Sequence, residues 1–354
     1  MEIRKLESQE HGETRFLYET VFTEDSRSFV DYYYTEKTKD NQIYVVEEED
    51  RIRAMLHLNP YTLMVNGVRK EADYIVAVAT QKEYRGRRYM ARLLEQSLGD
   101  MYQAGKTFTF LMPASEAIYL PHGFRTVYEQ QRRFCDETDF QKIKYRAGKT
   151  EAARGIRVEA SGELGVFVSQ AREEDLEDLA KKANAWLERH YQVYALRDEA
   201  YYRRLMKEYA SDGGDLMIYW KDGEITDCRP YMPGENGTQK PKIMIRIVDL
   251  RRMLMSLQLK SLAAVCFRVE DPIIPENNRC LTLTGTEYSG VMLMDSPEEN
   301  SEGTIPIAAL GSFLFGARTV EELYQEDGVI MTERMKNELK KIRQLEKIYL
   351  NEAV

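Results

Sequence analysis

The spacing of apolar residues changes from helical to strand-like within the first eighty positions of the chain. Helical spacing covers residues 15–21 and 29–37, and Ser28 is a candidate N-cap for the second of these helices. Residues 42–80 then read as successive strands. The turns expected among them fall at Glu49-Asp50 and at Asn66-Gly67. An Asn-Gly pair between apolar runs is a strong hairpin signal, so this part should form an antiparallel sheet.

A helix-and-strand pattern continues from residue 89. The expected elements are a helix ended by Gly105, a strand, a short helix with a loop, and another strand, over residues 89–104, 107–113, 114–124 and 125–134. The first domain is therefore expected to be mixed α/β and to span residues 1–140.

The rest of the chain divides into two further regions. Helices are expected at 173–189 and 198–210, followed by a hairpin that turns at Asp222-Gly223. After a polar linker at 236–241 come strands, short helices and a final amphipathic stretch over 332–345. Because 354 residues are too many for one ordinary core, we expect an α+β (mixed α/β) protein with domains at 1–140, 141–238 and 239–354.

Composition narrows the class of protein. Hydrophobic residues make up 43% and charged residues 31% of the chain, which is typical of a globular protein. No apolar stretch approaches the roughly 18–20 residues that span a bilayer, and the charged N-terminus is unlike a signal peptide. Four cysteines without a C-x-x-C pair argue against a zinc site and a disulfide framework. We expect a cytoplasmic protein without a metal or a membrane partner.

The net charge of −9 argues against a general nucleic-acid binder and is compatible with a cationic small substrate.

The stretch QKEYRGRRYM, residues 81–90, lies between an apolar strand and a helical pattern. Unpaired N–H groups at a helix N-terminus form a natural phosphate site, and Gly86 lets the backbone approach closely. Arg85, Arg87 and Arg88 add positive charge for a pyrophosphate or a ribose 3′-phosphate. The alternative interpretation is a solvated basic turn that caps a helix. The stretch lacks the paired glycines and the Lys-Ser/Thr of a Walker A motif.

The longer segment VAVATQKEYRGRRYMARLLEQSL resembles the acetyl coenzyme A segment of GNAT-type N-acetyltransferases. In that family a splayed strand contacts the pantetheine arm, and a Q/R-x-x-G-x-G/A loop holds the pyrophosphate. The loop departs from this pattern at Glu83, where Gln or Arg is usual, and at Arg88, where Gly or Ala is usual. The cofactor-binding residues that the resemblance implies are Val78, Ala79, Thr80, Arg85, Gly86, Arg87, Arg88, Tyr89, Met90 and Ser115.

Other segments are similar to the enhanced intracellular survival (Eis) family of N-acetyltransferases. LMPASEAIYLPHGF resembles the segment with its catalytic tyrosine, and HYQVYALRDEAYYRRLMKEYASDGGDLMIYW resembles its second GNAT-like domain. PKIMIRIVDLRRML and IPIAALGSFLFGARTVEEL resemble its sterol carrier protein-like domain. The short link between Met232 and Lys242 implies that the middle domain is truncated. The family's ring-like assemblies imply a homo-oligomer, by resemblance a hexamer.

Acetyl transfer to an amine needs a neutral amine, a polarised thioester carbonyl and a proton for the departing thiolate. The resemblance assigns Tyr119 as the general acid, the backbone at 78–80 to the carbonyl, and the C-terminal carboxylate of Val354 as the base. The alternatives are that Tyr119 packs in the core with its hydroxyl bonded and that the terminal helix frays. No cysteine lies in the expected site, so direct attack in a ternary complex is expected.

Three other residues could take part in proton transfer, and each also has an ordinary structural interpretation. His57 lies in a strand, where a histidine is more often a satisfied core residue. His122 lies near Tyr119 and could relay a proton, although a loop histidine beside Pro and Gly is more often on the surface. Glu116 lies in the first turn of a helix, where the dipole favours a carboxylate.

The acceptor side is expected in the aromatic and acidic segment DSRSFVDYYYTEKTKD, residues 25–40. Asp25, Phe29, Tyr32 and Tyr33 could hold a cation by charge and ring face, or they could pack an amphipathic helix on the sheet. The sequence thus predicts an N-acetyltransferase that uses acetyl coenzyme A and acts on an aminoglycoside, a polyamine or a lysine-type amine. The alternative is a non-catalytic regulatory protein that binds acetyl coenzyme A or a lipid.

Overall fold

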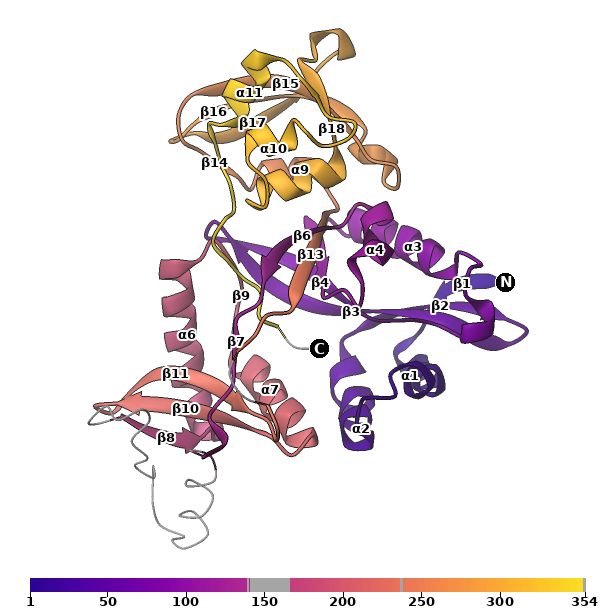
Figure 1. Ribbon diagram of the computed structural model, residues 1–354, viewed down its shortest axis with the longest axis vertical. Coiled ribbons are helices and arrows are strands. Elements are labelled where there is room, and N and C mark those ends of the chain that lie inside the picture. Colours follow the sequence, from indigo (N-terminus) through magenta and orange to yellow (C-terminus); the bar gives the residue numbers. More distant parts are fainter. Residues whose placement is uncertain (139, 141–165, 236–237, 353–354) are drawn as a thin grey trace, which may run out of the picture.

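The computed structural model describes residues 1–138, 140, 166–235 and 238–352, and its largest element is a nine-stranded sheet (Figure 1). The strand order is β1-β2-β3-β4-β5-β13-β6, while β9 pairs with the end of β3 and β21 pairs with β9. The strands are β1 Glu2–Lys5, β2 Gln42–Glu48, β3 Arg51–Val65, β4 Val68–Thr80, β5 Phe108–Leu111, β6 Arg125–Glu129, β9 Val193–Ala195, β13 Lys242–Ile247 and β21 Ile348–Tyr349.

Both hairpin turns predicted in this sheet are confirmed. Glu49 and Asp50 join β2 to β3, and Asn66 and Gly67 join β3 to β4. All four residues have positive φ, between 48° and 78°, which is the conformation that two-residue hairpin turns require.

Helices cover both faces of the sheet (Figure 1). α1 Arg15–Val21 and α2 Arg27–Thr35 lie on one face and α3 Tyr89–Gln103 on the other. The N-cap of α2 is Ser26 and not Ser28, because the Ser26 side chain accepts a hydrogen bond from the Phe29 N–H at 3.0 Å. α2 therefore begins two residues earlier than the apolar spacing predicts.

The predicted strand over 125–134 is two shorter strands. β6 ends at Glu129 and pairs with β13, whereas β7 Arg132–Arg133 pairs with β12 Thr238–Gln239. β13 itself lies between β5 and β6, so a strand from the predicted third domain completes the sheet of the first. Residues 243–247 are all buried, as expected of a strand that is paired at both edges and covered on both faces.

The middle region contains a three-stranded sheet and two helices. The elements are β8 Val166–Gln170, α6 Leu176–His190, α7 Glu199–Ser211, β10 Asp215–Lys221 and β11 Glu224–Tyr231. The hairpin turn at Asp222-Gly223 is confirmed, and Asp198 caps α7 by accepting from the Tyr201 N–H. α7 packs against α2, which brings the middle region beside the first domain.

The C-terminal region forms a five-stranded sheet with short helices. Its elements are α8 Leu250–Leu254, β14 Gln258–Leu259, β15 Ala263–Glu270, β16 Arg279–Thr286, β17 Gly290–Asp295, β18 Gly303–Pro306, α9 Ile307–Leu314, α10 Val320–Leu323, β19 Ile330–Met331, α11 Glu333–Leu339 and β20 Ile342–Arg343. The helical part of the predicted stretch 332–345 ends at Leu339, and β20 follows it.

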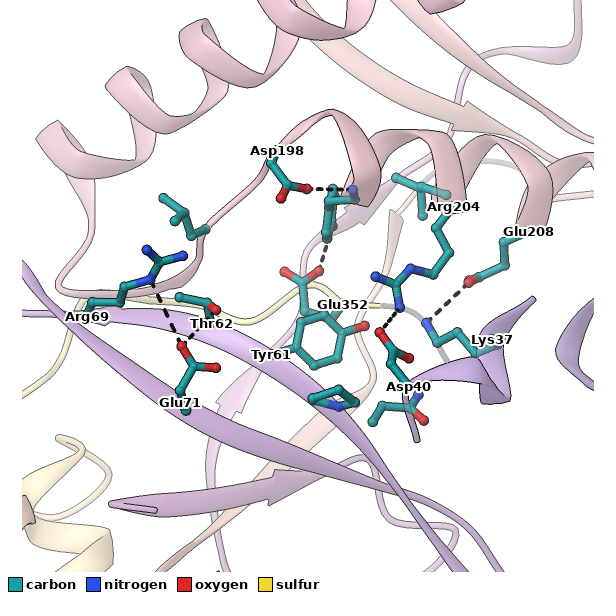
Figure 2. Close-up of a pocket in the computed structure, with 15 residues that line it drawn as sticks. Lys37, Asp40, Tyr61, Thr62, Arg69, Glu71, Asp198, Arg204, Glu208 and Glu352 are labelled. Atoms are coloured by element: carbon teal, nitrogen blue, oxygen red, sulfur yellow. Dashed lines mark hydrogen bonds and ion pairs between the residues drawn. The ribbon is translucent and has the colours of Figure 1, made fainter. Parts of the chain in front are cut away.

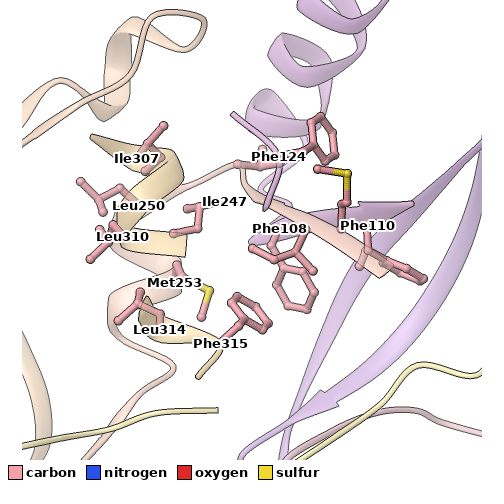
Figure 3. Close-up of a cluster of buried hydrophobic side chains, with 14 of the residues drawn as sticks. Phe108, Phe110, Phe124, Ile247, Leu250, Met253, Ile307, Leu310, Leu314 and Phe315 are labelled. Carbon is pink, nitrogen blue, oxygen red and sulfur yellow. The ribbon is translucent and has the colours of Figure 1, made fainter. Parts of the chain in front are cut away.

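α9 joins this region to the first domain. All eight of its residues are buried, and it packs on β13 and β6. Leu310, Leu314 and Phe315 lie in one apolar cluster with Phe108 and Ile247 from the main sheet (Figure 3). The rings of Phe108 and Phe315 are 5.0 Å apart. The first and last regions of the chain thus share a single core.

Candidate active site

The site begins where β4 leaves β5. The two parallel strands pair only at Tyr74 with Phe110 and at Ile75 with Leu111, while β4 continues to Thr80. Against β3, the register of β4 shifts so that Ala77 and Val78 together stand opposite one residue. Ala77 has a φ of +49°, which is unusual for a residue with a side chain. Such bulges redirect a strand and are frequent next to active sites.

The predicted backbone residues Val78, Ala79 and Thr80 lie directly after this bulge. Val78 belongs to the bulge, while Ala79 and Thr80 pair with Met55 and Ala54 of β3, and within the described residues no strand pairs with the three on the other side. Their open edge can offer N–H donors to a carbonyl or an amide chain.

The predicted anion loop connects this strand to α3. A short 3-10 turn, Lys82–Tyr84, is followed by Gly86 with a φ of +78° and by Arg88 with a φ of +63°. Arg88 is the N-cap of α3, but no side chain caps the helix by a hydrogen bond. The first N–H groups of α3, from Tyr89 and Met90 onward, are therefore left for an anion.

The side chains of the loop leave its backbone accessible. The side chain of Arg88 is 79% exposed and lies 3.9 Å from Glu95 on α3, away from the loop. Arg87 lies 3.6 Å from Glu48 and over the ring of Tyr84. The departure from the family pattern at Arg88 thus places a non-glycine residue in the left-handed region and leaves its side chain in solvent.

Replacing Arg88 with glycine should stabilise the protein. Glycine adopts a φ of +63° without the steric cost that a β-carbon adds, so the free energy of unfolding should rise by about 0.5–1 kcal/mol. Arg85→Gly is the matched control because Arg85 has a φ of −62°. There glycine increases the entropy of the unfolded chain and removes an exposed hydrogen bond from Arg85 Nε to the Thr80 carbonyl, so stability should fall by about 0.5–1 kcal/mol. Urea denaturation of both variants checks the opposite signs, and a loss with Arg88→Gly would contradict the strain argument.

Tyr119 lies on α4 Glu116–Tyr119, the short helix after β5, which begins at the exposed N-cap Ser115. Its ring is 7% exposed and packs edge-on against Phe124, with ring centroids 5.8 Å apart. Burial raises the pKa of Tyr119 to about 12. Among the described residues, the Tyr119 hydroxyl has no hydrogen-bond partner, and it is not one of the fully buried unpartnered atoms, so it keeps some contact with solvent. Tyr119 is therefore a buried, protonated phenol whose proton is not engaged by the protein.

The three alternative bases are in different situations. Glu116 accepts from Lys242 at 2.6 Å and from Thr126 at 2.7 Å, and these contacts lower its pKa. Burial lowers the pKa of His122. Burial also lowers the pKa of His57, to about 3. His57 Nδ1 lies 2.9 Å from the Tyr33 hydroxyl.

The predicted acceptor residues pack mainly within the first domain. Tyr33 is fully buried, with its hydroxyl on His57, and the Asp25 carboxylate accepts from the Tyr18 hydroxyl at 2.7 Å. Burial raises the pKa of Asp25. Phe29 is half-buried, with its ring 6.2 Å from that of Tyr33. Their role in binding an acceptor stays a prediction.

A cavity of about 270 Å³ lies beside these residues, between β3, α7 and the chain's last described residues (Figure 2). We call it the interdomain cavity. Asp25, Phe29 and Tyr33 do not line it. Its lining residues are Lys37, Asp40, Asn59, Pro60, Tyr61, Thr62, Arg69, Glu71, Leu196, Asp198, Tyr201, Arg204, Leu205, Glu208 and Glu352.

Carboxylates outnumber cations in this lining, five to three. Arg204 lies 2.9 Å from Asp40, and Lys37 lies 3.5 Å from Glu208, a pair in which both side chains are buried. Burial raises the pKa of Glu208, and Lys37 opposes this. Glu352 also lies 3.8 Å from the partly buried Arg197, so most of these carboxylates already face a cation, and the remaining negative charge that could attract a cationic guest is small. Glu208 is not predicted as a site residue from the sequence, since nothing in its local pattern distinguishes it from a surface glutamate of a helix.

The end of the chain reaches the same cavity. Gln130 Nε2 donates to the Leu350 carbonyl at 2.7 Å, and Arg132 donates to the Glu352 carbonyl at 2.9 Å. The Glu352 side chain is 1% exposed and accepts from the Tyr201 hydroxyl at 2.5 Å. Val354, the predicted base, lies outside the described residues.

The described residues contain no group of three or more His, Cys, Asp or Glu side chains placed to hold a metal ion. Within the same parts of the chain, none of the helices has the length and apolarity that crossing a bilayer requires.

Two protein-family descriptions match the sequence. That of an acetyltransferase (GNAT) domain matches residues 2–127, which include the bulged strand, the anion loop and Tyr119. The first domain is a GNAT acetyltransferase domain. A sterol carrier protein domain matches residues 244–351, so β13 of the GNAT sheet falls largely within that match. The GNAT domain supports acyltransferase activity for this chain.

Solved structures share the architecture over nearly the whole chain. A conserved protein from Enterococcus faecalis, described as a probable N-acyltransferase, is 15% identical with a TM-score of 0.75, and the match covers 98% of both chains. A GCN5-related N-acetyltransferase from Anabaena variabilis is 13% identical with a TM-score of 0.73, covering 98% of this chain and 99% of that one.

Eis1 from Mycobacterium abscessus is 13% identical with a TM-score of 0.68, and the match covers 99% of both chains. At these identities the likeness establishes the fold alone. A search of curated protein sequences found no match. The GNAT and sterol carrier domains predicted from the sequence are confirmed, whereas membership of the Eis family stays a prediction.

Proposed function

We propose that this chain transfers the acetyl group of acetyl coenzyme A to a primary amine. One observation carries the proposal: the GNAT domain joins a bulged, splayed β4 to an uncapped α3 through a basic loop. The open backbone edge at 78–80 suits the pantetheine arm and the thioester carbonyl. The N-terminus of α3, with Arg85 and Arg87, suits the pyrophosphate.

The chemistry that we propose is direct attack in a ternary complex. The α-carboxylate of Val354 takes a proton from the acceptor ammonium, and the neutral amine attacks the thioester carbon. The C–N bond forms, the C–S bond breaks, and Tyr119 gives its proton to the departing thiolate. The nitrogen, cationic after the attack, releases its second proton to give the amide, and this proton restores the Tyr119 phenol. Two facts support these roles: the Tyr119 hydroxyl has no other partner in the described residues, and the chain is buried beside the interdomain cavity as far as Glu352.

We assign the acceptor to the interdomain cavity, where the small excess of carboxylates favours an amine in its cationic form. Aminoglycosides, polyamines and lysine-type amines all fit this description. A homo-oligomer, by resemblance a hexamer, and a cytoplasmic location remain predictions. The regulatory alternative, with a lipid in the sterol carrier domain, is less favoured because α9 of that domain is buried against the GNAT sheet.

The experiment is free coenzyme A release from acetyl coenzyme A with a panel of polyamines, aminoglycosides and lysine peptides. Wild type should show release that depends on the acceptor. Removing residues 353–354 should lower kcat by about a hundredfold, the lower end for a catalytic base, because an α-carboxyl of pKa about 3.5 is a weak base. The thermal midpoint should stay unchanged, since the contacts of Glu352 remain. Tight binding of acetyl coenzyme A without release on any amine would favour the regulatory alternative.

A further inference from the structure

Two buried polar side chains lie opposite each other on β3 and β4. Asn59 and Tyr74 are register partners on these neighbouring strands, so their side chains are on the same face of the sheet. Asn59 is 2% exposed and Tyr74 is 1% exposed. Among the described residues, the two amide atoms of Asn59 and the hydroxyl of Tyr74 lack a hydrogen-bond partner. A buried polar group without a partner costs stability and calls for an explanation.

Their place in the fold connects the two halves of the site. Asn59 lines the interdomain cavity, as does Tyr61, whose ring packs edge-on against that of Tyr74 at 6.2 Å. Tyr74 also stacks on Phe110 at 4.9 Å, one residue before the last position at which β4 and β5 pair. The pair therefore lies between the cavity and the parting of the strands.

The charges around the Tyr74 hydroxyl come from the same site. Burial is the main cause that raises its pKa, and Arg132 opposes this. Glu208, Glu352 and Tyr119 each raise it further. The hydroxyl is therefore neutral at physiological pH, and its oxygen can accept a hydrogen bond.

We propose that Asn59 Oδ1 and the Tyr74 hydroxyl oxygen hold the two N–H groups of the attacking primary amine. This inference rests on the proposed function. A neutral primary amine has two N–H donors and one lone pair, so two fixed acceptors leave the lone pair for the thioester carbon. A secondary amine has one N–H and leaves one buried acceptor unpaired. The pair thus selects primary over secondary amines, and Asn59 Nδ2 is left to donate to an oxygen of the acceptor.

The test compares a primary amine from the panel with its N-methylated counterpart, in wild type, Tyr74→Phe and Asn59→Leu. Each variant should lower kcat/KM for the primary amine by about tenfold and for the secondary amine by at most about twofold. The KM for acetyl coenzyme A should stay unchanged. Tyr44→Phe is the matched control, because this buried tyrosine donates to Asp100 at 2.9 Å on the face covered by α3.

Thermal stability distinguishes a binding role from a structural one. Tyr74→Phe keeps the ring stack and removes only an unpartnered hydroxyl, so its thermal midpoint should equal or exceed that of wild type. A lower midpoint together with an unchanged preference for primary amines would overturn the inference. Should wild type release no coenzyme A, the proposed function fails by itself. In that case thermal shifts test the pair. The inference is supported if the primary amine raises the thermal midpoint of wild type but not that of Tyr74→Phe, and if the methylated amine raises neither; any other result overturns it.

Discussion

Tyr119→Phe should lower kcat by about a thousandfold while the KM for acetyl coenzyme A stays near that of wild type. The substitution removes one oxygen and keeps the ring against Phe124. Without the phenol, the departing thiolate has no positioned proton donor. Steady-state kinetics of coenzyme A release with a saturating amine measures the change.

The pH dependence gives a second measure of the same assignment. A pKa of about 12 means that about nine tenths or more of the Tyr119 hydroxyl groups keep their proton up to about pH 11. A general acid must be protonated to act, so kcat should show no alkaline decline due to this group up to about pH 11. Tyr44→Phe is the matched control and should retain at least half of the wild-type kcat, since that hydroxyl binds Asp100. Equal losses in the two variants would remove Tyr119 from the chemistry.

Arg246→Met should lower the free energy of unfolding by about 3–5 kcal/mol. Arg246 on β13 and Asp271 of the C-terminal region are both fully buried, with Nη2 2.6 Å from Oδ1. Truncating the arginine leaves the aspartate buried without its counter-charge, and the remaining donors from Asn277, Ile273 and Ile274 offset this only in part. Urea denaturation gives the value.

Arg251→Met is the control for this variant. Arg251 also forms an ion pair, 2.8 Å from Asp295, but the two side chains are 35% and 63% exposed. An exposed pair contributes little, so the control should cost less than about 1 kcal/mol. A similar loss in the free energy of unfolding for the two variants would show that the buried ion pair contributes no more than the exposed one.

The buried pair also bears on catalysis. Arg246 Nε donates to the His122 carbonyl at 2.8 Å, in the loop directly after Tyr119. Gly123 follows with a φ of +83°, and a β-carbon there would lie 3.2 Å from Arg246 Nε. The sterol carrier domain thus contributes the strand and the side chain that fix the position of the Tyr119 loop, which gives this domain a role without a lipid.

The sequence by itself determined the features that depend on neighbouring residues. The turns at Asn66-Gly67 and Asp222-Gly223 follow from residues that tolerate positive φ, and the anion loop follows from Gly86 before an amphipathic helix. These signals are local because a turn or a helix end is fixed by a few backbone angles. The cap of α2 was predicted two residues too late. Ser26 and Ser28 are both serines near the helix start, and only the hydrogen bond to the Phe29 N–H shows that Ser26 is the cap.

Only the tertiary structure decided the features that join distant segments. No local pattern predicts that β13 joins the first sheet or that Glu208 and Glu352 line one cavity. Nor does any local pattern predict that Asn59 lies opposite Tyr74 without a hydrogen-bond partner. The local sequence around a strand, a helical glutamate or an asparagine does not show which distant segment it will pack against. Their meaning depends on which surfaces the shared core brings together, and that is settled by the summed burial of residues hundreds of positions apart.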